Sequence, residues 1–328
     1  MRVTMEDVAR EAGVSRALVS LALRNAYGVK DSTRDHIMAV ADRLNFQPNA
    51  LAANLARRKT NSLGVFLLDL HNEYFAEVFD GVREVASAAG KELVLSVGST
   101  SGELDKPALN ALVQAQVDVV VAAGLLLSNK DIAPYVQRLP MVSVARRVPG
   151  ADSVVSDNEL GATLAVTHLL ELGHRRILHL AAPPSDGYRG RRRGYSRVMK
   201  AAGLTPRVLV SDYSREEAAR KIGLMLAGSD LPTAVFAHND QTAMGVLDAL
   251  HANGIRVPDE MSVIGYDNTP LSRPPGVALT TVDQHSVALG RRAAEVALTR
   301  LTHRDAPLIE ENYPPSLVVR GTTAPPAG

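Results

Sequence analysis

From Ser62 onward, short apolar runs alternate with longer segments in which apolar residues recur every three to four positions. This alternation is typical of strands and helices in a parallel sheet that helices cover on both faces. The sequence therefore predicts an α/β fold for this part of the chain. The expected strands are residues 63–68, 92–97, 117–122, 141–145, 177–181, 208–210, 234–237, 262–266 and 279–282.

These strands are too many for one compact sheet, so two similar doubly wound parallel-sheet lobes are expected within a core of residues 61–328. The boundary is placed near residues 156–158, and the chain from Ser286 is expected to return to the first lobe. Lobe 1 is then about 61–157 with 286–328, and lobe 2 is about 158–285.

The first 46 residues follow a different pattern, that of three short helices. Thr4 can cap the first helix, Gly13 can end it, and Ser15 can cap the second. A third helix is expected from Ser32. Two short helices joined by a glycine turn form a helix-turn-helix, whose second helix enters the major groove of DNA. Residues 1–46 are therefore predicted to be an all-α helix-turn-helix DNA-binding domain.

Residues 47–60 are rich in alanine and leucine after Pro48 and carry too little apolar surface to fold alone. A helix this short is marginal in water, so the segment is predicted to be a hinge helix that forms only with support. Leu55 beside Ala52 offers apolar surface to a minor groove, where an inserted leucine kinks the duplex. The alternative is that Leu55 packs as an ordinary residue in a helix core and does not contact DNA.

Charge is distributed unevenly although the net charge is only +1. Residues 1–60 hold ten Lys and Arg against six Asp and Glu, and the rest of the chain has an acidic excess. A local basic excess suits a head that meets phosphates. The chain has no cysteine, which excludes disulfides and thiolate metal sites, and no cofactor or metal is expected. No signal peptide or membrane-length apolar run is found, so a cytoplasmic location is expected.

Several blocks occur in an order that resembles the LacI/GalR (lactose-repressor/galactose-repressor) family. They are the head from Val3 to Leu23, Phe46-Gln-Pro-Asn, Glu171-Leu-Gly-His-Arg-Arg-Ile, Pro232-Thr-Ala-Val-Phe-Ala-His-Asn-Asp, Pro258-Asp-Glu-Met-Ser-Val-Ile-Gly-Tyr-Asp-Asn-Thr and Leu279-Thr-Thr-Val-Asp-Gln. The resemblance implies a homodimeric transcription regulator with a periplasmic-binding-protein-like core. Leu18 and Leu21 depart from the family, which usually has Thr and often Arg there.

The DNA-binding residues are expected on the second helix and in the hinge. Arg16 can donate two hydrogen bonds to guanine, and hydroxyls near the helix starts can hold phosphates. A solvated surface role for Arg16 is the alternative. The resemblance places Asn49 on the DNA backbone and Leu55 at the intercalating position. The expected set is Thr4, Ser15, Arg16, Ala17, Ser20, Leu21, Thr33, Asn49, Ala52 and Leu55.

A second set of residues follows the ends of predicted strands, where parallel α/β sheets bind ligands. An arginine beside carboxylates and amides suits a ligand rich in hydroxyls, and an aromatic side chain can stack on a sugar ring. For the two aromatic residues, core packing is the alternative. The run 189–193 contains four arginines, and the resemblance assigns one of them, Arg191, to contact with the effector. The expected effector-binding set is Asp69, Tyr74, Phe75, Arg146, Arg191, Asn239, Asp267 and Gln284.

The sequence thus predicts a homodimeric DNA-binding regulator, expected to be a repressor, whose affinity for a near-palindromic operator is controlled by a small molecule, expected to be a carbohydrate. A sugar-binding transport component would have no use for residues 1–60. An enzyme is the other alternative, because Asp240 and Asp267 could flank a bond. No phosphate-binding loop, nucleophile elbow or metal cluster supports it. Effector identity and operator sequence stay open.

Overall fold

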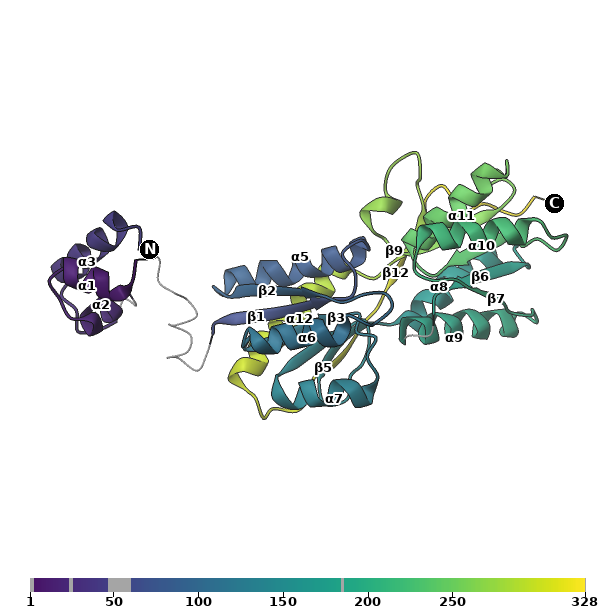
Figure 1. The fold of residues 1–328 in the computed structure, drawn as a ribbon. Coiled ribbons are helices and arrows are strands. Elements are labelled where there is room, and N and C mark those ends of the chain that lie inside the picture. The colour runs from purple at the N-terminus through teal and green to yellow at the C-terminus, as the bar shows by residue number, and fades with distance from the viewer. Residues whose placement is uncertain (1–2, 24–25, 47–59, 184–185, 328) are drawn as a thin grey trace. The chain divides into compact units, whose positions relative to one another are not determined.

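The computed structural model describes residues 3–23, 26–46, 60–183 and 186–327. The chain divides into two compact units, Met1–Thr60 and Asn61–Gly328 (Figure 1). In the described part, no helix is both long enough and apolar enough to cross a membrane. The predicted hinge residues Asn49, Ala52 and Leu55 lie outside the described residues.

The first unit is a bundle of three helices, α1 (Met5–Glu11), α2 (Arg16–Leu23) and α3 (Asp31–Arg43). Its core is small, and its fully buried members include Val8, Val19 and Ile37, one from each helix. The predicted cap at Thr4 is present as a reciprocal capping box with Asp7. The third helix begins at Asp31, one residue before the expected start.

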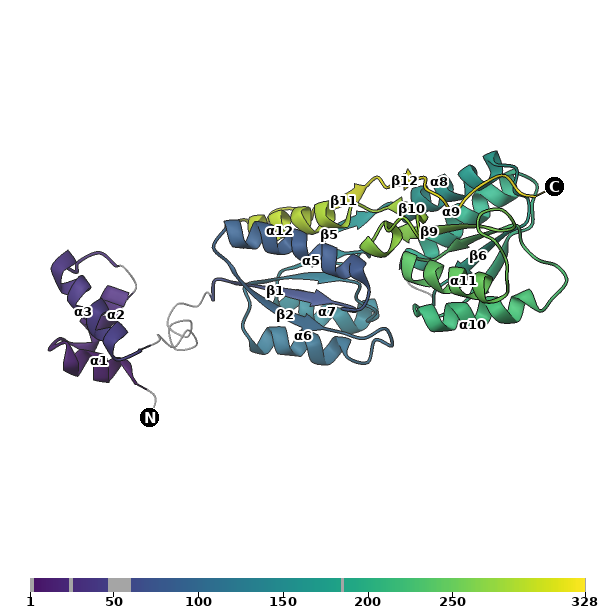
Figure 2. The ribbon, with the colours of Figure 1, turned by 90° about the horizontal axis from the view of Figure 1, so that it is seen from above.

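The second unit holds two six-stranded sheets (Figures 1 and 2). The first sheet has the order β11-β5-β4-β3-β1-β2 and is parallel throughout. Its strands are β1 (Ser62–Leu67), β2 (Glu92–Val97), β3 (Val119–Ala123), β4 (Met141–Val144), β5 (Asp152–Ser156) and β11 (Glu310–Tyr313). Helices α5 (Glu73–Ala88) and α12 (Ser286–Thr302) cover one face, and α6 (Asp105–Gln114) and α7 (Asn129–Arg138) cover the other.

The second sheet has the order β12-β10-β9-β8-β6-β7. Its strands are β6 (Ile177–Ala181), β7 (Arg207–Val210), β8 (Ala234–Ala237), β9 (Ser262–Asp267), β10 (Thr280–Asp283) and β12 (Ser316–Val318). Helices α8 (Asn158–Glu171) and α9 (Asp186–Ala201) cover one face. Helices α10 (Arg215–Leu226) and α11 (Asp240–Ala252) cover the other, and the short η1 (Pro270–Ser272) follows β9.

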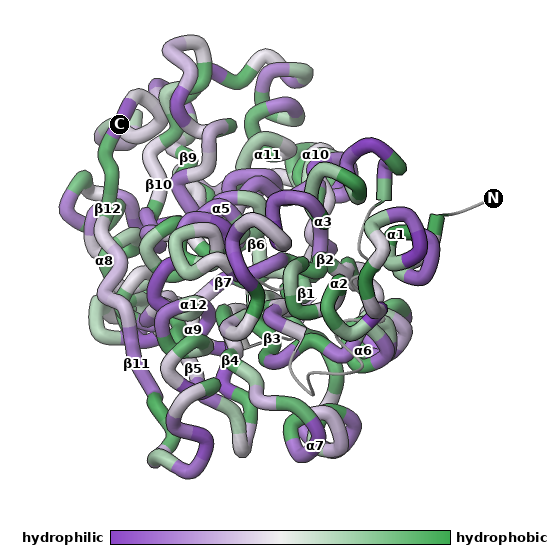
Figure 3. Tube along the Cα trace, turned by 90° about the vertical axis from the view of Figure 1, so that its left-hand side faces the viewer, coloured by the Kyte–Doolittle hydropathy of each residue, from purple (hydrophilic) through white to green (hydrophobic). Residues whose placement is uncertain are grey.

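Alternation of apolar residues explains how one strand serves both faces of a sheet. In β1, Leu63, Val65 and Leu67 enter the core under α5 and α12, whereas Phe66 enters the core under α6 and α7. Successive side chains of a strand point to opposite faces, so a strand covered on both sides must be apolar throughout. Helix α7 is instead amphipathic, as its mixed colouring in Figure 3 shows.

The end of the chain corrects one expectation. Residues 286–328 were expected to belong wholly to lobe 1, and α12 and β11 do, but β12 pairs antiparallel with β10 in the second sheet. The tail then follows lobe 2, where Val263 N donates to Thr322 O at 2.8 Å. The edge of β10 would otherwise present unpaired backbone groups, and β12 covers it. Lobe 2 is therefore not entirely parallel.

Candidate functional site

A cleft lies between the two lobes of the second unit and encloses about 710 Å³, including its open mouth. Its walls come from the carboxyl ends of strands in both sheets, where crossovers leave room for a ligand. Arg146 follows β4, Asn239 follows β8, and Gln284 follows β10. All eight residues of the predicted effector set line this cleft: Asp69, Tyr74, Phe75, Arg146, Arg191, Asn239, Asp267 and Gln284.

Arg191 on α9 is the buried cation of the cleft, with only 6% of its surface exposed. Its Nε donates to Asn158 Oδ1 at 2.9 Å, and its Nη1 donates to the carbonyl of His238. Its Nη2 lies 3.7 Å from Asp267 Oδ1, and its guanidinium carbon lies 3.7 Å from the ring centroid of Tyr266. A buried charge is destabilising unless it is paired and hydrogen-bonded, so these four partners fix the guanidinium in one orientation.

Asp267 is the carboxylate that faces Arg191. Gln284 Nε2 donates to its Oδ1 at 2.5 Å, and its backbone has a φ of 113°, in the left-handed region. Burial raises the pKa of Asp267 to about 8, while the charge of Arg191 opposes the rise. A carboxyl that titrates near neutral pH can both donate and accept hydrogen bonds. Ala145, beside Arg146, also has a positive φ of 74°, and such backbone outliers cluster at binding sites.

Asp240, the other carboxylate that the sequence suggested, does not line the cleft. Its Oδ2 accepts from the backbone N of Thr269 at 2.7 Å and from its hydroxyl at 3.1 Å, and its Oδ1 accepts from Thr281 Oγ1 at 2.6 Å. Burial raises the pKa of Asp240 to about 6. Both oxygens are thus used to hold the segment after β9, which positions the neighbouring Asp267.

The aromatic pair Tyr74 and Phe75 serves the core and the cleft together. The side chains are 4% and 7% exposed, and both belong to the apolar core under α5 and α12. Their ring centroids lie 5.2 Å apart with the planes at 76°, an edge-to-face arrangement. Asn72 caps α5 by accepting from Tyr74 N at 3.0 Å, which sets where the two rings emerge. Tyr74 and Phe75 therefore pack in the core, and both also line the cleft.

Adjacent arginines after β4 point in different directions, as expected for an extended segment. Arg146 lines the cleft and donates to the carbonyls of Leu125 at 3.3 Å and Leu127 at 2.6 Å. Arg147 Nη2 instead donates to Asn312 Oδ1 at 2.8 Å, on β11. The carbonyl contacts tie Arg146 to lobe 1.

Among the cleft residues that were not in the predicted set, three have polar side chains that bear on the site. Asn158 begins α8 directly after β5, and it was missed because β5 was not recognised as a strand. Tyr213 and His238 follow β7 and β8, so the strand-end rule could have found both. The rings of Tyr213 and His238 meet at 68° with centroids 5.7 Å apart. Burial lowers the pKa of His238 well below its usual value, so its imidazole is neutral.

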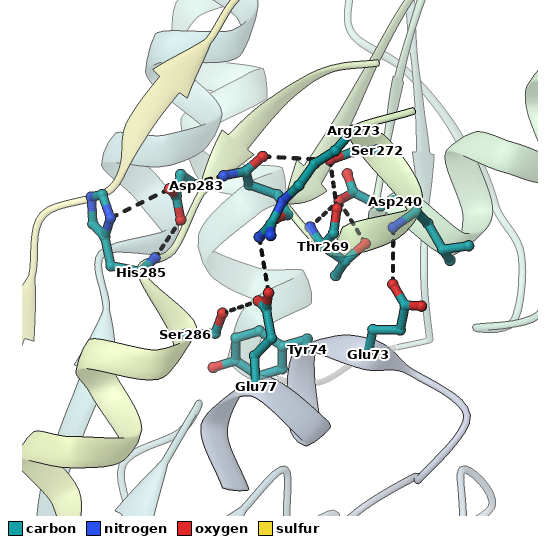
Figure 4. A network of polar contacts seen from close by, with 12 residues as sticks. Glu73, Tyr74, Glu77, Asp240, Thr269, Ser272, Arg273, Asp283, His285 and Ser286 are labelled. Atoms are coloured by element: carbon teal, nitrogen blue, oxygen red, sulfur yellow. Dashed lines mark hydrogen bonds and ion pairs between the residues drawn. The ribbon is translucent and has the colours of Figure 1, made fainter. Parts of the chain in front are cut away.

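A polar contact joins α5 of lobe 1 to the η1 segment of lobe 2 beside the cleft (Figure 4). Glu73 Oε2 accepts from Leu271 N at 2.9 Å, and Glu77 Oε1 accepts from Arg273 Nη2 at 2.9 Å. Ser286 Oγ, at the start of α12, donates to Glu77 Oε2 at 2.5 Å. We call the contacts of Glu73 and Glu77 with Leu271 and Arg273 the α5–η1 contact.

In the first unit, the predicted DNA-binding residues differ in exposure. Arg16 and Ala17 are exposed at the start of α2, and Arg16 has no hydrogen bond or ion pair to any described residue. Ser15 Oγ accepts from Leu18 N at 3.2 Å, which is the predicted cap. Leu21 is half-buried and packs against the helical core. Of the others that the structure describes, Thr4 is exposed and Ser20 and Thr33 are half-buried.

Comparison with known proteins identifies both units. Residues 4–49 match the family model described as bacterial regulatory proteins, lacI family, and residues 166–323 match the periplasmic binding protein-like domain. The chain is 32% identical over 327 residues to the HTH-type transcriptional repressor PurR of Photobacterium profundum, covering 97% of each chain.

Two solved structures extend the likeness to the fold. The lac repressor dimer bound to operator and the anti-inducer ONPF is 29% identical with a TM-score of 0.87, over 99% of this chain and 100% of that one. The complex of the transcriptional regulator CelR with cellobiose is 26% identical with a TM-score of 0.71, over 98% of this chain and 100% of that one.

Proposed function

The chain belongs to the LacI family of DNA-binding transcriptional regulators, and from this premise we propose that it is a homodimeric repressor controlled by a carbohydrate. The carbohydrate binds in the cleft between the lobes and changes the affinity of the protein for a near-palindromic operator. Family members are regulators with a ligand-binding domain and not enzymes.

The observation that carries the carbohydrate proposal is the buried set of Arg191, Asp267 and Gln284. A sugar hydroxyl both donates and accepts, so a sugar site needs donors and acceptors at fixed positions. Arg191 and Gln284 supply donors, and Asp267 supplies an acceptor that its raised pKa also lets act as a donor. The rings of Tyr74 and Phe75 add an apolar wall for the face of the sugar.

A flat nucleobase is the competing small ligand, and it stacks on one aromatic face or in a slot between two parallel faces. Tyr74 and Phe75 stand at 76° to each other and cannot form such a slot. Tyr213 lines the cleft next to His238, and that pair is also edge-to-face, at 68°. Neither pair forms a slot for a base, so the preference for a carbohydrate rests on the polar set of Arg191, Asp267 and Gln284.

For DNA recognition, we propose that the exposed Arg16 reads a guanine in the major groove of each half-site. A single helix-turn-helix makes few contacts, and a dimer doubles them and reads two half-sites. Thr4 and Ser15 lie at helix starts, where hydroxyls and backbone N–H groups hold phosphates. Leu55 in the hinge is proposed to wedge into the central minor-groove step.

For control, we propose that the ligand changes how the lobes close, and that closure changes the spacing of the two hinges in the dimer. A ligand shifts such an equilibrium only through its different affinity for the two states, typically by about 1–3 kcal/mol. The α5–η1 contact spans the lobes beside the cleft and is positioned to respond to closure.

Ligand binding to the full chain tests the cleft. Thermal shift would be measured with monosaccharides, disaccharides and nucleobases, and then repeated on Arg191→Ala and Asp267→Ala. Arg197→Ala is the matched control, because Arg197 lies on the same helix, pairs with Glu159 at 2.8 Å and does not line the cleft. We expect a sugar to stabilise the parent chain and the control but neither cleft variant. A ligand that both cleft variants retain would contradict the site, and a nucleobase as the sole ligand would contradict the carbohydrate proposal.

A further inference from the structure

A second cavity adjoins the cleft and encloses about 1110 Å³, including the part that is open to solvent. We call it the outer cavity. Leu68, Asp69, Thr100 and Tyr213 line both spaces, so the two lie side by side. Like the cleft, the outer cavity takes residues from both lobes. A ligand that filled both spaces would contact both lobes in the cleft and again in the outer cavity.

The polar side chains of the outer cavity supply hydroxyls, carboxylates, an amide and the imidazole of His71. Ser99 Oγ and Ser101 Oγ lie 3.1 Å apart, and Asp212 Oδ1 accepts from Ser214 N and from Ser214 Oγ, both at 2.7 Å. Gln241 Oε1 is buried and has no hydrogen-bond partner among the described residues. An unpaired buried acceptor is destabilising, and a hydroxyl donor that reached it would remove that penalty.

Apolar surface lies beside these groups. Leu70 is 51% exposed, and it lines the outer cavity together with Val97, Pro183 and the half-buried Tyr213. One exposed leucine alone is ordinary. An aromatic ring beside aliphatic carbons and hydroxyls, however, matches a sugar ring, which has apolar faces and polar edges.

Charge distinguishes the two spaces. The cleft contains Arg146 and Arg191, whereas no lysine or arginine occurs among the described residues that line the outer cavity. Asp69 and Asp212 line the outer cavity, and the only basic side chain among its described lining residues is the imidazole of His71, whose Nδ1 lies 3.2 Å from Asp69 Oδ1. A phosphate placed there would therefore meet two carboxylates and no guanidinium or ammonium group. The second unit of a ligand is therefore expected to be uncharged.

We infer that the outer cavity is a second subsite and that the effector is a neutral molecule of two sugar rings. One ring lies in the cleft at Arg191 and Asp267, and the second lies between Tyr213 and the Ser99–Ser101 loop. This inference rests on the proposed carbohydrate function and adds the size and the charge of the ligand.

Calorimetry on the full chain tests the size of the ligand. Glucose, galactose and ribose would be compared with maltose, lactose, cellobiose and trehalose. We expect one two-ring sugar to bind at least about tenfold more tightly than any single ring. If single rings bind as tightly as any two-ring sugar, the second subsite is wrong and the carbohydrate function stands. If no sugar binds, the carbohydrate function itself is wrong.

A pair of variants places the second ring. Ser101→Trp fills the outer cavity at an exposed position, and Glu103→Trp adds the same bulk at an exposed residue of the same loop that does not line it. Ser101→Trp should remove the roughly tenfold preference for two rings and leave single-ring affinity within about twofold, whereas Glu103→Trp should change neither. Equal loss for one and two rings, or an unchanged preference in Ser101→Trp, would overturn the assignment.

The charge of the ligand is tested with the 6-phosphates of maltose and trehalose, for whichever parent sugar binds. The phosphate should weaken binding by about tenfold, and the isosteric Asp212→Asn should recover part of that loss. Tighter binding of the phosphate, or no recovery in Asp212→Asn, would contradict a neutral ligand.

Discussion

Glu77 on α5 accepts a hydrogen bond from Arg273 Nη2 at 2.9 Å, and the two residues belong to different lobes. The carboxylate is mostly shielded, with 15% of its side chain exposed, whereas the arginine is 52% exposed. Glu77 is also held by Ser286, so it is oriented from its own lobe before it meets Arg273. The pair therefore links the two lobes of the second unit.

Removing this link should affect ligand binding more than folding. A half-exposed ion pair contributes only about 0–1 kcal/mol to stability, so Arg273→Ala should leave the free energy of unfolding nearly unchanged. Closure around a ligand should become less favourable, and we expect effector affinity to fall about threefold to tenfold by calorimetry. Arg291→Ala is the control, because Arg291 pairs with Glu84 at 2.8 Å within lobe 1. Equal effects of the two substitutions on affinity would contradict the link.

Asp267 should make the stability of the core depend on pH. In the unfolded chain this carboxyl loses its proton near pH 4, whereas burial raises its folded-state pKa to about 8. Between those values the folded state binds more protons than the unfolded state, so the free energy of unfolding falls as pH rises.

The variant Asp267→Asn cannot ionise and should remove this contribution. One proton accounts for at most about 1.4 kcal/mol per pH unit. Urea unfolding of the parent chain and the variant at several pH values between about 5 and 8 measures the slope. Asp259→Asn, at an exposed residue paired with Arg256, should keep the parent slope. Identical slopes for all three proteins would show that Asp267 is ionised throughout.

Close packing of α5 on α12 depends on glycine. A Cβ at Gly290 would meet the backbone carbonyl of Val78, where nothing can give way. Gly290→Ala should therefore destabilise the core by about 1–3 kcal/mol. Gly223 on α10 has open space around it, so Gly223→Ala should stabilise by about 0.5–1 kcal/mol through helix propensity. Denaturant midpoints measure both effects, and the same sign for the two would contradict the packing argument.

Two substitutions in the DNA-binding part of the chain should distinguish a base contact in the major groove from a wedge in the minor groove. Arg16→Ala should weaken operator binding by about 1–3 kcal/mol and relax preference at one base pair, since a bidentate contact to guanine is lost.

Leu55→Ala should weaken specific binding and reduce DNA bending while sparing non-specific affinity. Anisotropy on operator and scrambled duplexes at fixed salt measures both. Uniform loss on both duplexes would assign Arg16 to phosphate, and unchanged bending in Leu55→Ala would remove the wedge.

The strands with four or more consecutive apolar residues could be predicted because burial on both faces leaves a strong signal. β1 and β8 are such strands, and each lies within two residues of its predicted bounds. β5 (Asp152–Ser156) escaped because its polar ends resemble a loop. Asp152, at the start of β5, is buried because it holds Arg300 on α12 at 2.7 Å. β12 escaped because three residues on an edge carry almost no pattern.

The cleft residues that follow the ends of strands could be predicted, because the carboxyl ends of parallel strands meet at one edge of a sheet. That rule places Arg146, Asn239 and Asp267 in one cleft, and the family resemblance was needed for Arg191, which lies on a helix. The partners of Arg191 could not be predicted, because Asn158 and the carbonyl of His238 meet it only through the packing of α8, α9 and β8. Nothing in the sequence indicated that Gln241 Oε1 is buried without a partner among the residues that the structure describes.

The central claim is that occupancy of the cleft sets operator affinity. The most direct test is operator affinity by anisotropy against sugar concentration, with an operator selected from genomic fragments and the salt held fixed. The sugar should change operator affinity by about 5–150-fold in the parent chain. Arg191→Ala should bind operator normally without sugar and show no change with it. A sugar that binds the cleft and leaves operator affinity unchanged, or an Arg191→Ala protein with the full response, would contradict the account.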